Sequence, residues 1–157
     1  MKTNTSLSKA EYRLLDLGIS EPNLIDVEAI AWDEGVKVQY GDLSRCEARL
    51  VGFGDRGIVT IRSGSDERRM RFSLAHELGH WNYHRGRSFS CRADDWVDGY
   101  STKPTEERVA DEYAAELLMP AYMFNPLARH QTTYVRWRNE FGGSIQNKPY
   151  CYCYPVG

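Results

Sequence analysis

Apolar positions near the N-terminus recur with the period of an α-helix. Ser8 and Glu11 form the pattern of a capping box, and Gly18 is expected to end this first helix. A second helix is expected from Pro22 to Gly35, because Pro suits the first turn of a helix and Gly the position after its end. The apolar residues of this second segment share one helical face: Leu24, Val27, Ile30 and Ala31.

The period of the pattern then changes from helical spacing to strict alternation. The alternating apolar residues of a first strand are Val36, Val38 and Tyr40. A second strand is expected around residues 50–53 and a third over 57–61, with the segment 54–57 as a hairpin turn. These strands predict a small, mostly antiparallel sheet.

Two longer helices are expected after the strands. The first spans about residues 66–83, with Ser65 as its N-cap, and it is apolar around most of its circumference, which predicts burial. The second spans about residues 104–119 and ends at Pro120. The Gly-, Ser- and Asp-rich segment 86–102 between them is long for a loop, which is typical of a segment that borders a site.

The length and composition fit one globular domain. The chain has 157 residues, of which 41% are hydrophobic and 27% charged. We expect one domain over residues 1–157, with a core over about 20–125 and a tail over about 126–157 that forms a helix near 126–141 and is otherwise irregular. The net charge of -2 argues against a nucleic-acid surface, and no direct nucleic-acid contact is expected.

No apolar run is long enough for a signal peptide or a membrane span, so we expect a cytoplasmic protein without membrane contact. Cysteines in that reducing compartment are expected to be free thiols. The pair Cys151 and Cys153 could also bind each other or a metal, but no second Cys or His pair with zinc-finger spacing accompanies it.

The helix expected over residues 66–83 carries the motif His76-Glu77-Leu78-Gly79-His80, which is H-E-x-x-H. Residues four apart lie one turn apart on one face, so both imidazoles can reach one cation. Glu77 projects toward the edge of that face, where its carboxylate would lie near a metal-bound water and not bind the metal itself. Zinc lowers the pKa of its bound water to roughly 7, so a carboxylate at this place can act as the general base that removes the water's proton. The alternative is a core helix that carries the two histidines by chance. This alternative is disfavoured, because burying three ionisable groups without partners would cost much free energy.

A third metal ligand is not expected on the same helix. His84 continues the face of His76 and His80, but His76 and His84 are about 12 Å apart along a straight helix at ~1.5 Å per residue. The metzincin pattern breaks its helix with a glycine before a third His, and Tyr83 and Gly86 stand at those two positions here. His84 is therefore interpreted as a helix-end residue.

The later helix offers a carboxylate as the third ligand. Glu107 and Asp111 are four apart and share a face, and the alanines of this helix allow close packing against Gly79. We expect Glu107 to reach the metal and Asp111 to hold the other N–H of a ligand histidine. Glu106, about 100° around the helix, is the alternative ligand or a solvated first-turn carboxylate.

These residues resemble those of gluzincins, the thermolysin-like metallopeptidases, and more closely those of the ImmA/IrrE family. Residues 71–80 read RFSLAHELGH, similar to the family's R-F-T-L-A-H-E-L-G-H, and residues 107–120 resemble its E-x-x-A-N-x-F-A-A-x-L-L-M-P. Asp111 and Tyr113 depart from the family's Asn and Phe. The resemblance implies a compact α+β, zincin-like fold in which a buried H-E-x-x-H helix packs on a glutamate-bearing helix.

The resemblance also implies an activity. One Zn²⁺ would be held by His76, His80 and Glu107, with Glu77 as general base. The expected function is a zinc-dependent endopeptidase that cleaves a cytoplasmic protein, a helix-turn-helix repressor by the family's associations. Two other functions stay open: a catalytically silent zinc protein that sequesters a repressor, and a toxin-like metallopeptidase. A fourth ligand from the protein, such as Cys91 or Asp94, would favour the silent protein.

Peptide hydrolysis also needs a hydrogen-bond donor to the oxyanion that develops on the scissile carbonyl. The candidates for this donor are Tyr113, His84 and Tyr83.

Overall fold

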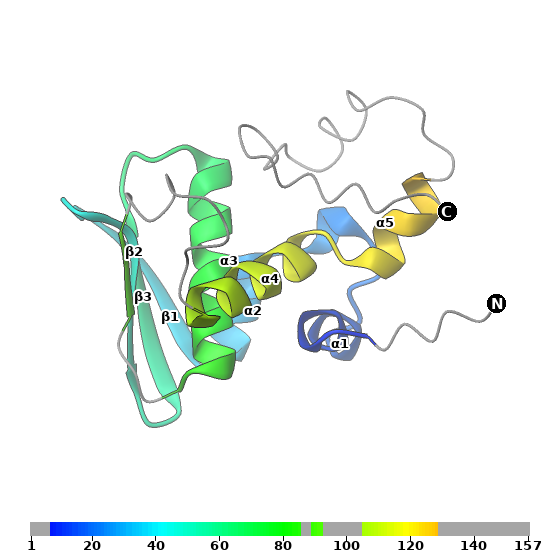
Figure 1. Cartoon of the computed structure of the whole chain (residues 1–157), viewed down its shortest axis with the longest axis horizontal. Helices are drawn as coiled ribbons and strands as arrows, with labels where there is room; N and C mark the ends of the chain where they lie inside the picture. Colours follow the sequence, from blue (N-terminus) through cyan, green and yellow to red (C-terminus); the bar gives the residue numbers. More distant parts are fainter. Residues whose placement is uncertain (1–6, 86–88, 93–104, 129–157) are drawn as a thin grey trace.

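The computed structural model describes residues 7–85, 89–92 and 105–128 (Figure 1). In chain order, the helices and strands of this part are α1 (Lys9–Asp16), the 3₁₀ turn η1 (Pro22–Leu24), α2 (Val27–Asp33), β1 (Val36–Gly41), β2 (Cys46–Phe53), β3 (Arg56–Arg62), α3 (Glu67–Tyr83), β4 (Phe89–Arg92), α4 (Thr105–Leu118) and α5 (Ala121–Ala128). None of the described helices is long and apolar enough to cross a membrane.

The sheet has the strand order β1-β3-β2-β4. Strands β2 and β3 form the expected hairpin, and β4 continues the sheet as a second antiparallel neighbour of β2. Strand β1 pairs with β3 in parallel, with Val36 opposite Gly57. The α+β class and the mostly antiparallel sheet are therefore confirmed, while β4 was not expected within the predicted loop of residues 86–102.

One face of the sheet forms the core with α3. Alternating strand residues point toward the helix and are buried: Val36, Ala48, Leu50, Val59 and Ile61. Trp81 of α3 lies directly over two strand glycines, since an ideal Cβ would come within 3.0 Å of its ring at Gly52 and 3.1 Å at Gly57. The absence of a side chain at both glycines lets α3 approach the sheet closely.

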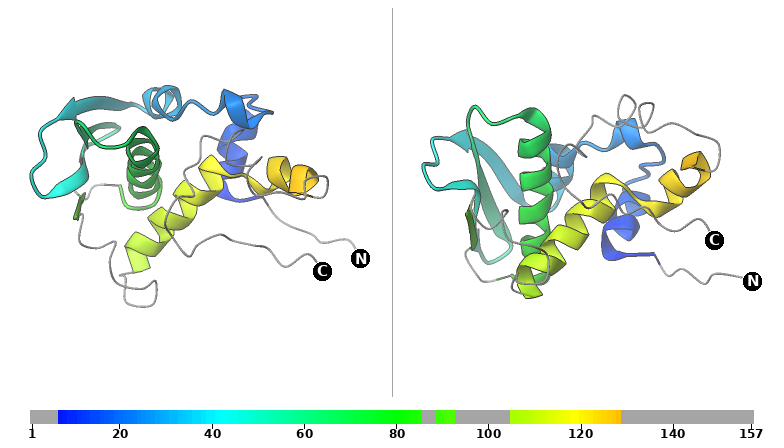
Figure 2. Two further views of the ribbon diagram at one scale, coloured as in Figure 1. Left: turned by 90° about the horizontal axis from the view of Figure 1, so that it is seen from above. Right: turned by 45° about the horizontal axis from the view of Figure 1, so that its top comes forward.

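The helices form the rest of the structure. Helix α3 lies along the sheet, α4 crosses α3 on its other side, and α1 and α5 lie toward the far end of α4 (Figure 2). The start of α5 is tied to α1, because the Ala121 N–H donates a 2.8 Å hydrogen bond to Glu11 Oε1. This arrangement confirms that the H-E-x-x-H helix is buried and packed on the glutamate-bearing helix.

The first helix agrees with its prediction. Ser8 and Glu11 form both hydrogen bonds of the capping box, and Gly18 follows the helix with a φ of 70°. The helix expected over residues 126–141 begins earlier, as α5 at Ala121, and most of that range lies outside the described residues.

Two other helix boundaries differ from the prediction. The helix expected from Pro22 to Gly35 is split, because the Asp26 side chain accepts hydrogen bonds from the Glu28 and Ala29 N–H groups and starts α2 anew. Leu24 consequently lies outside the helical face and is 53% exposed. Asp66, rather than Ser65, caps α3, and the Ser65 hydroxyl instead donates to Glu47 at 2.8 Å.

Candidate metal centre

Helix α3 brings two buried imidazoles together. His76 and His80 lie one helical turn apart and are 3% and 0% exposed. Their Nε2 atoms face each other at 3.1 Å. Two neutral Nε2 lone pairs at this distance would repel each other, so the arrangement needs either a proton or a cation between them.

Helix α4 adds a carboxylate to this pair. Glu107 Oε2 lies 3.2 Å from His76 Nε2, and Glu107 Oε1 lies 3.2 Å from His80 Nε2. Close packing of the two helices makes this reach possible, because an ideal Cβ at Gly79 would lie only 2.8 Å from Ala110 Cα. The close packing of the later helix against Gly79, expected from the sequence, is therefore present.

The three side chains fit a divalent metal ion. One ligand atom from each of His76, His80 and Glu107 lies within 4.8 Å of the other two. Two ligands bound at ~2.0–2.1 Å to one tetrahedral ion are about 3.3 Å apart, close to the separations observed here. Two imidazoles and one carboxylate are also the donor set of catalytic zinc sites, which leave a position open for water or substrate.

Asp111 lies behind one of the two histidines. Its Oδ1 is 3.0 Å from His76 Nδ1 and accepts the hydrogen bond when that nitrogen carries the proton. The proton on Nδ1 leaves the Nε2 lone pair directed at His80 and Glu107. The structure therefore places the Asp111 carboxylate against the ring nitrogen of His76 that faces away from His80 and Glu107.

The sequence of the chain matches one known family model. The family model of the IrrE N-terminal-like domain, Peptidase_M78, matches residues 31–146. The chain belongs to this IrrE-like peptidase family. A search of curated proteins gave no significant match. Family membership supports a metallopeptidase-type function, and it confirms the ImmA/IrrE resemblance read from the two helical motifs.

Glu77 of this IrrE-like peptidase is fully buried beside His76. Its position on α3 is about 100° around the helix axis from His76, and its charge raises the pKa of His76. The ligand atoms that converge between the helices come from the other three residues, not from Glu77. A carboxylate that is close to a metal but does not bind it is suited to moving protons.

The charges of the centre are strongly coupled. Burial lowers the pKa of His76, but the hydrogen bonds to Asp111 and Glu107 and the charge of Glu77 outweigh burial and raise this pKa to about 9. Burial raises the pKa of Glu107, but the contacts with His76 and His80 outweigh it and hold this pKa well below its usual range. Without a metal, His76 is therefore protonated at neutral pH and Glu107 is ionised.

We expect metal affinity to rise with pH between about 7 and 9. The metal must displace the proton of His76, which is held up to a pKa of about 9, so each pH unit below that value weakens binding by at most roughly tenfold. Competition titrations of the metal-free protein at pH 7, 8 and 9, corrected for the chelator's own protonation, measure this slope. Affinity independent of pH over that interval would show that His76 does not carry the proton.

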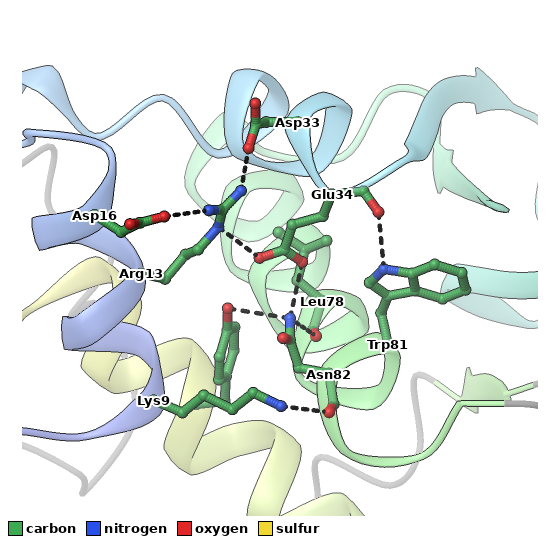
Figure 3. A network of polar contacts seen from close by, with 9 residues as sticks. Lys9, Arg13, Asp16, Asp33, Glu34, Leu78, Trp81 and Asn82 are labelled. Carbon is green, nitrogen blue, oxygen red and sulfur yellow. Dashed lines mark hydrogen bonds and ion pairs between the residues drawn. The ribbon is translucent and has the colours of Figure 1, made fainter. Parts of the chain in front are cut away.

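A second polar network fixes the opposite side of α3 (Figure 3). The Glu34 carboxylate accepts a 2.8 Å hydrogen bond from Asn82 Nδ2 and pairs with Arg13 Nε at 3.3 Å, while its backbone carbonyl accepts from Trp81 Nε1 at 3.2 Å. Burial raises the pKa of Glu34 against the opposing contacts with Asn82 and Arg13. These contacts orient α3 about its axis so that the histidines face α4.

The same network bears on Tyr113, one of the three candidates for the donor that stabilises the oxyanion. The Tyr113 hydroxyl accepts a 3.2 Å hydrogen bond from Asn82 and is buried in this network, so it does not face the histidines. Asp111 and Tyr113 are two residues apart in α4, which places them about 200° apart around the helix. Of the other two candidates, Tyr83 lies against the Tyr113 ring and His84 lies beside His80.

Asp94, Cys151 and Cys153 lie outside the described residues, and Cys91 is described only as part of β4. The alternative ligand Glu106 is not among the converging ligand atoms in the described part of the chain.

Proposed function

We propose that this protein is a zinc-dependent endopeptidase of the gluzincin type. One observation carries the proposal: two imidazole nitrogens of α3 and the Glu107 carboxylate of α4 converge with ligand atoms 3.1–3.2 Å apart. The membership of the chain in a peptidase family supports hydrolysis of a peptide bond by this centre.

Each residue of the centre has a separate task in the proposed reaction. Zinc, when bound, polarises the scissile carbonyl and lowers the pKa of water. His76, His80 and Glu107 hold the cation, and Asp111 keeps the ring of His76 in place. Glu77 accepts a proton from the attacking water and then donates it to the leaving amine.

The proposed substrate is a cytoplasmic protein, a helix-turn-helix transcriptional repressor. Its support is the resemblance of the two helical motifs to the ImmA/IrrE family, whose members are associated with such repressors. The chain's net charge of -2 agrees with a protease that recognises the repressor protein and not its DNA.

The test combines metal analysis with a cleavage assay. The purified protein is assayed for bound zinc and incubated with purified helix-turn-helix repressors from the same genome, and products are detected by intact-mass spectrometry. We expect one zinc per chain, discrete cleavage products, loss of cleavage with a chelator and recovery with added zinc. Binding of the intact repressor without products from the zinc-loaded protein would favour the silent sequestering function instead.

A further inference from the structure

The second ring nitrogen of His80 has a neighbour that family membership does not assign. His80 Nδ1 lies 3.2 Å from Nδ1 of His84, one turn further along α3. The two rings are 5.3 Å apart between centroids and tilted by 50°. His80 therefore has its two nitrogens in two settings, with Nε2 at the metal centre and Nδ1 beside His84.

This geometry selects one pattern of protons. Metal binding through His80 Nε2 requires a lone pair on that atom, so the ring's single proton must then be on Nδ1. The Nδ1–H of the fully buried His80 needs an acceptor, and the atom that faces it is His84 Nδ1. His84 can accept this bond only with its own proton on Nε2.

The fold holds His84 in that position. His84 is the C-terminal cap of α3, and its backbone N–H donates a 2.8 Å hydrogen bond to the His80 carbonyl. The residue is half-buried, and its i, i+4 spacing from His80 keeps both rings on one face. The backbone bond at the end of the helix thus fixes the backbone of His84, and its ring lies against that of His80.

We propose that His84 is a positioning residue, which accepts a hydrogen bond from His80 and thereby orients His80 as a metal ligand. It does for His80 what Asp111 does for His76, with a neutral imidazole in place of a carboxylate. The inference rests on the proposed metal site, but it adds a residue that lies outside the three converging ligands.

A matched pair of variants separates the acceptor from the bulk of the side chain. In His84→Asn, the amide Oδ1 occupies the place of the imidazole Nδ1 and still accepts a hydrogen bond. In His84→Leu, a carbon atom occupies that place and accepts none. Because loss of such a partner costs about 10- to 100-fold in metal affinity, we expect this loss for Leu and near-wild-type affinity for Asn.

The first measurement is Co²⁺ and Zn²⁺ affinity by competition with a chromophoric chelator, together with the visible absorption of the Co²⁺-loaded protein. We expect the Leu variant to bind more weakly with an altered Co²⁺ spectrum, and the Asn variant to retain the wild-type spectrum. Wild-type affinity of the Leu variant, or equal weakening of both variants at matched thermal stability, would overturn the role of His84.

The second measurement is independent of affinity and activity. Nitrogen-detected NMR of the histidine rings in the zinc-loaded protein reports which nitrogen of each ring carries the proton. We expect His80 with its proton on Nδ1, His84 with its proton on Nε2, and a scalar coupling between the two Nδ1 atoms across the hydrogen bond. A His84 ring with its proton on Nδ1 overturns this inference, whereas a wild-type protein that binds no metal overturns the proposed function.

Discussion

Replacing Glu77 with Gln is expected to reduce peptide hydrolysis by roughly 10²- to 10⁴-fold, the contribution typical of a general base. Gln has the shape of Glu but cannot accept the proton of the attacking water. Metal affinity is expected to stay near the wild-type value, because the converging ligand atoms come from His76, His80 and Glu107. Cleavage rates and metal content of the same preparation measure both effects.

The matched control for this variant is Glu67→Gln. Glu67 is an exposed carboxylate in the first turn of the same helix, far along α3 from the metal centre. The Glu67→Gln protein should therefore cleave at the wild-type rate. Full activity of the Glu77→Gln protein would show that another group removes the proton.

Replacing Gly79 with Ala is expected to push α3 and α4 apart. The new Cβ would lie 2.8 Å from Ala110 Cα and 2.9 Å from the Ala110 carbonyl oxygen, and backbone atoms cannot move aside as a flexible side chain can. Overpacking of this kind costs about 1–3 kcal/mol or more, and the better helix propensity of Ala returns up to about 1 kcal/mol. We expect the free energy of unfolding to fall by about 1–2 kcal/mol.

Metal affinity should fall with stability in this variant, because Glu107 lies on the helix that is displaced. Chemical denaturation and metal competition measure the two losses. The control is Gly41→Ala in β1, where the new Cβ would meet only a side-chain methyl of Thr60 at 3.3 Å and little change is expected. A Gly79→Ala protein that is as stable and binds metal as tightly as the wild type would contradict the close helix contact.

The features that could be predicted from the sequence depend on local spacing. The i, i+4 spacing of His76 and His80 places them on one face of any helix, and the capping box at Ser8 depends only on residues within one turn. The approach of Glu107 could also be predicted, because Gly79 leaves room for a close helix crossing.

The features that could not be predicted depend on contacts between distant segments. The parallel pairing of β1 with β3 and the addition of β4 to the sheet are set by tertiary contacts that alternation of polar and apolar residues does not encode. The side of α4 on which Tyr113 is buried became evident only through its contact with Asn82. The break before α2 had a local signal, the capping side chain of Asp26, but a continuous apolar face obscured it.

The most direct test of the central claim is a crystal structure of the zinc-loaded protein with anomalous diffraction at the zinc absorption edge. We predict one strong peak between α3 and α4, at ~2.0–2.2 Å from the Nε2 atoms of His76 and His80 and from a carboxylate oxygen of Glu107. A peak bound elsewhere, or a Glu107 side chain turned away from the two histidines in the zinc-loaded crystal, would contradict the account.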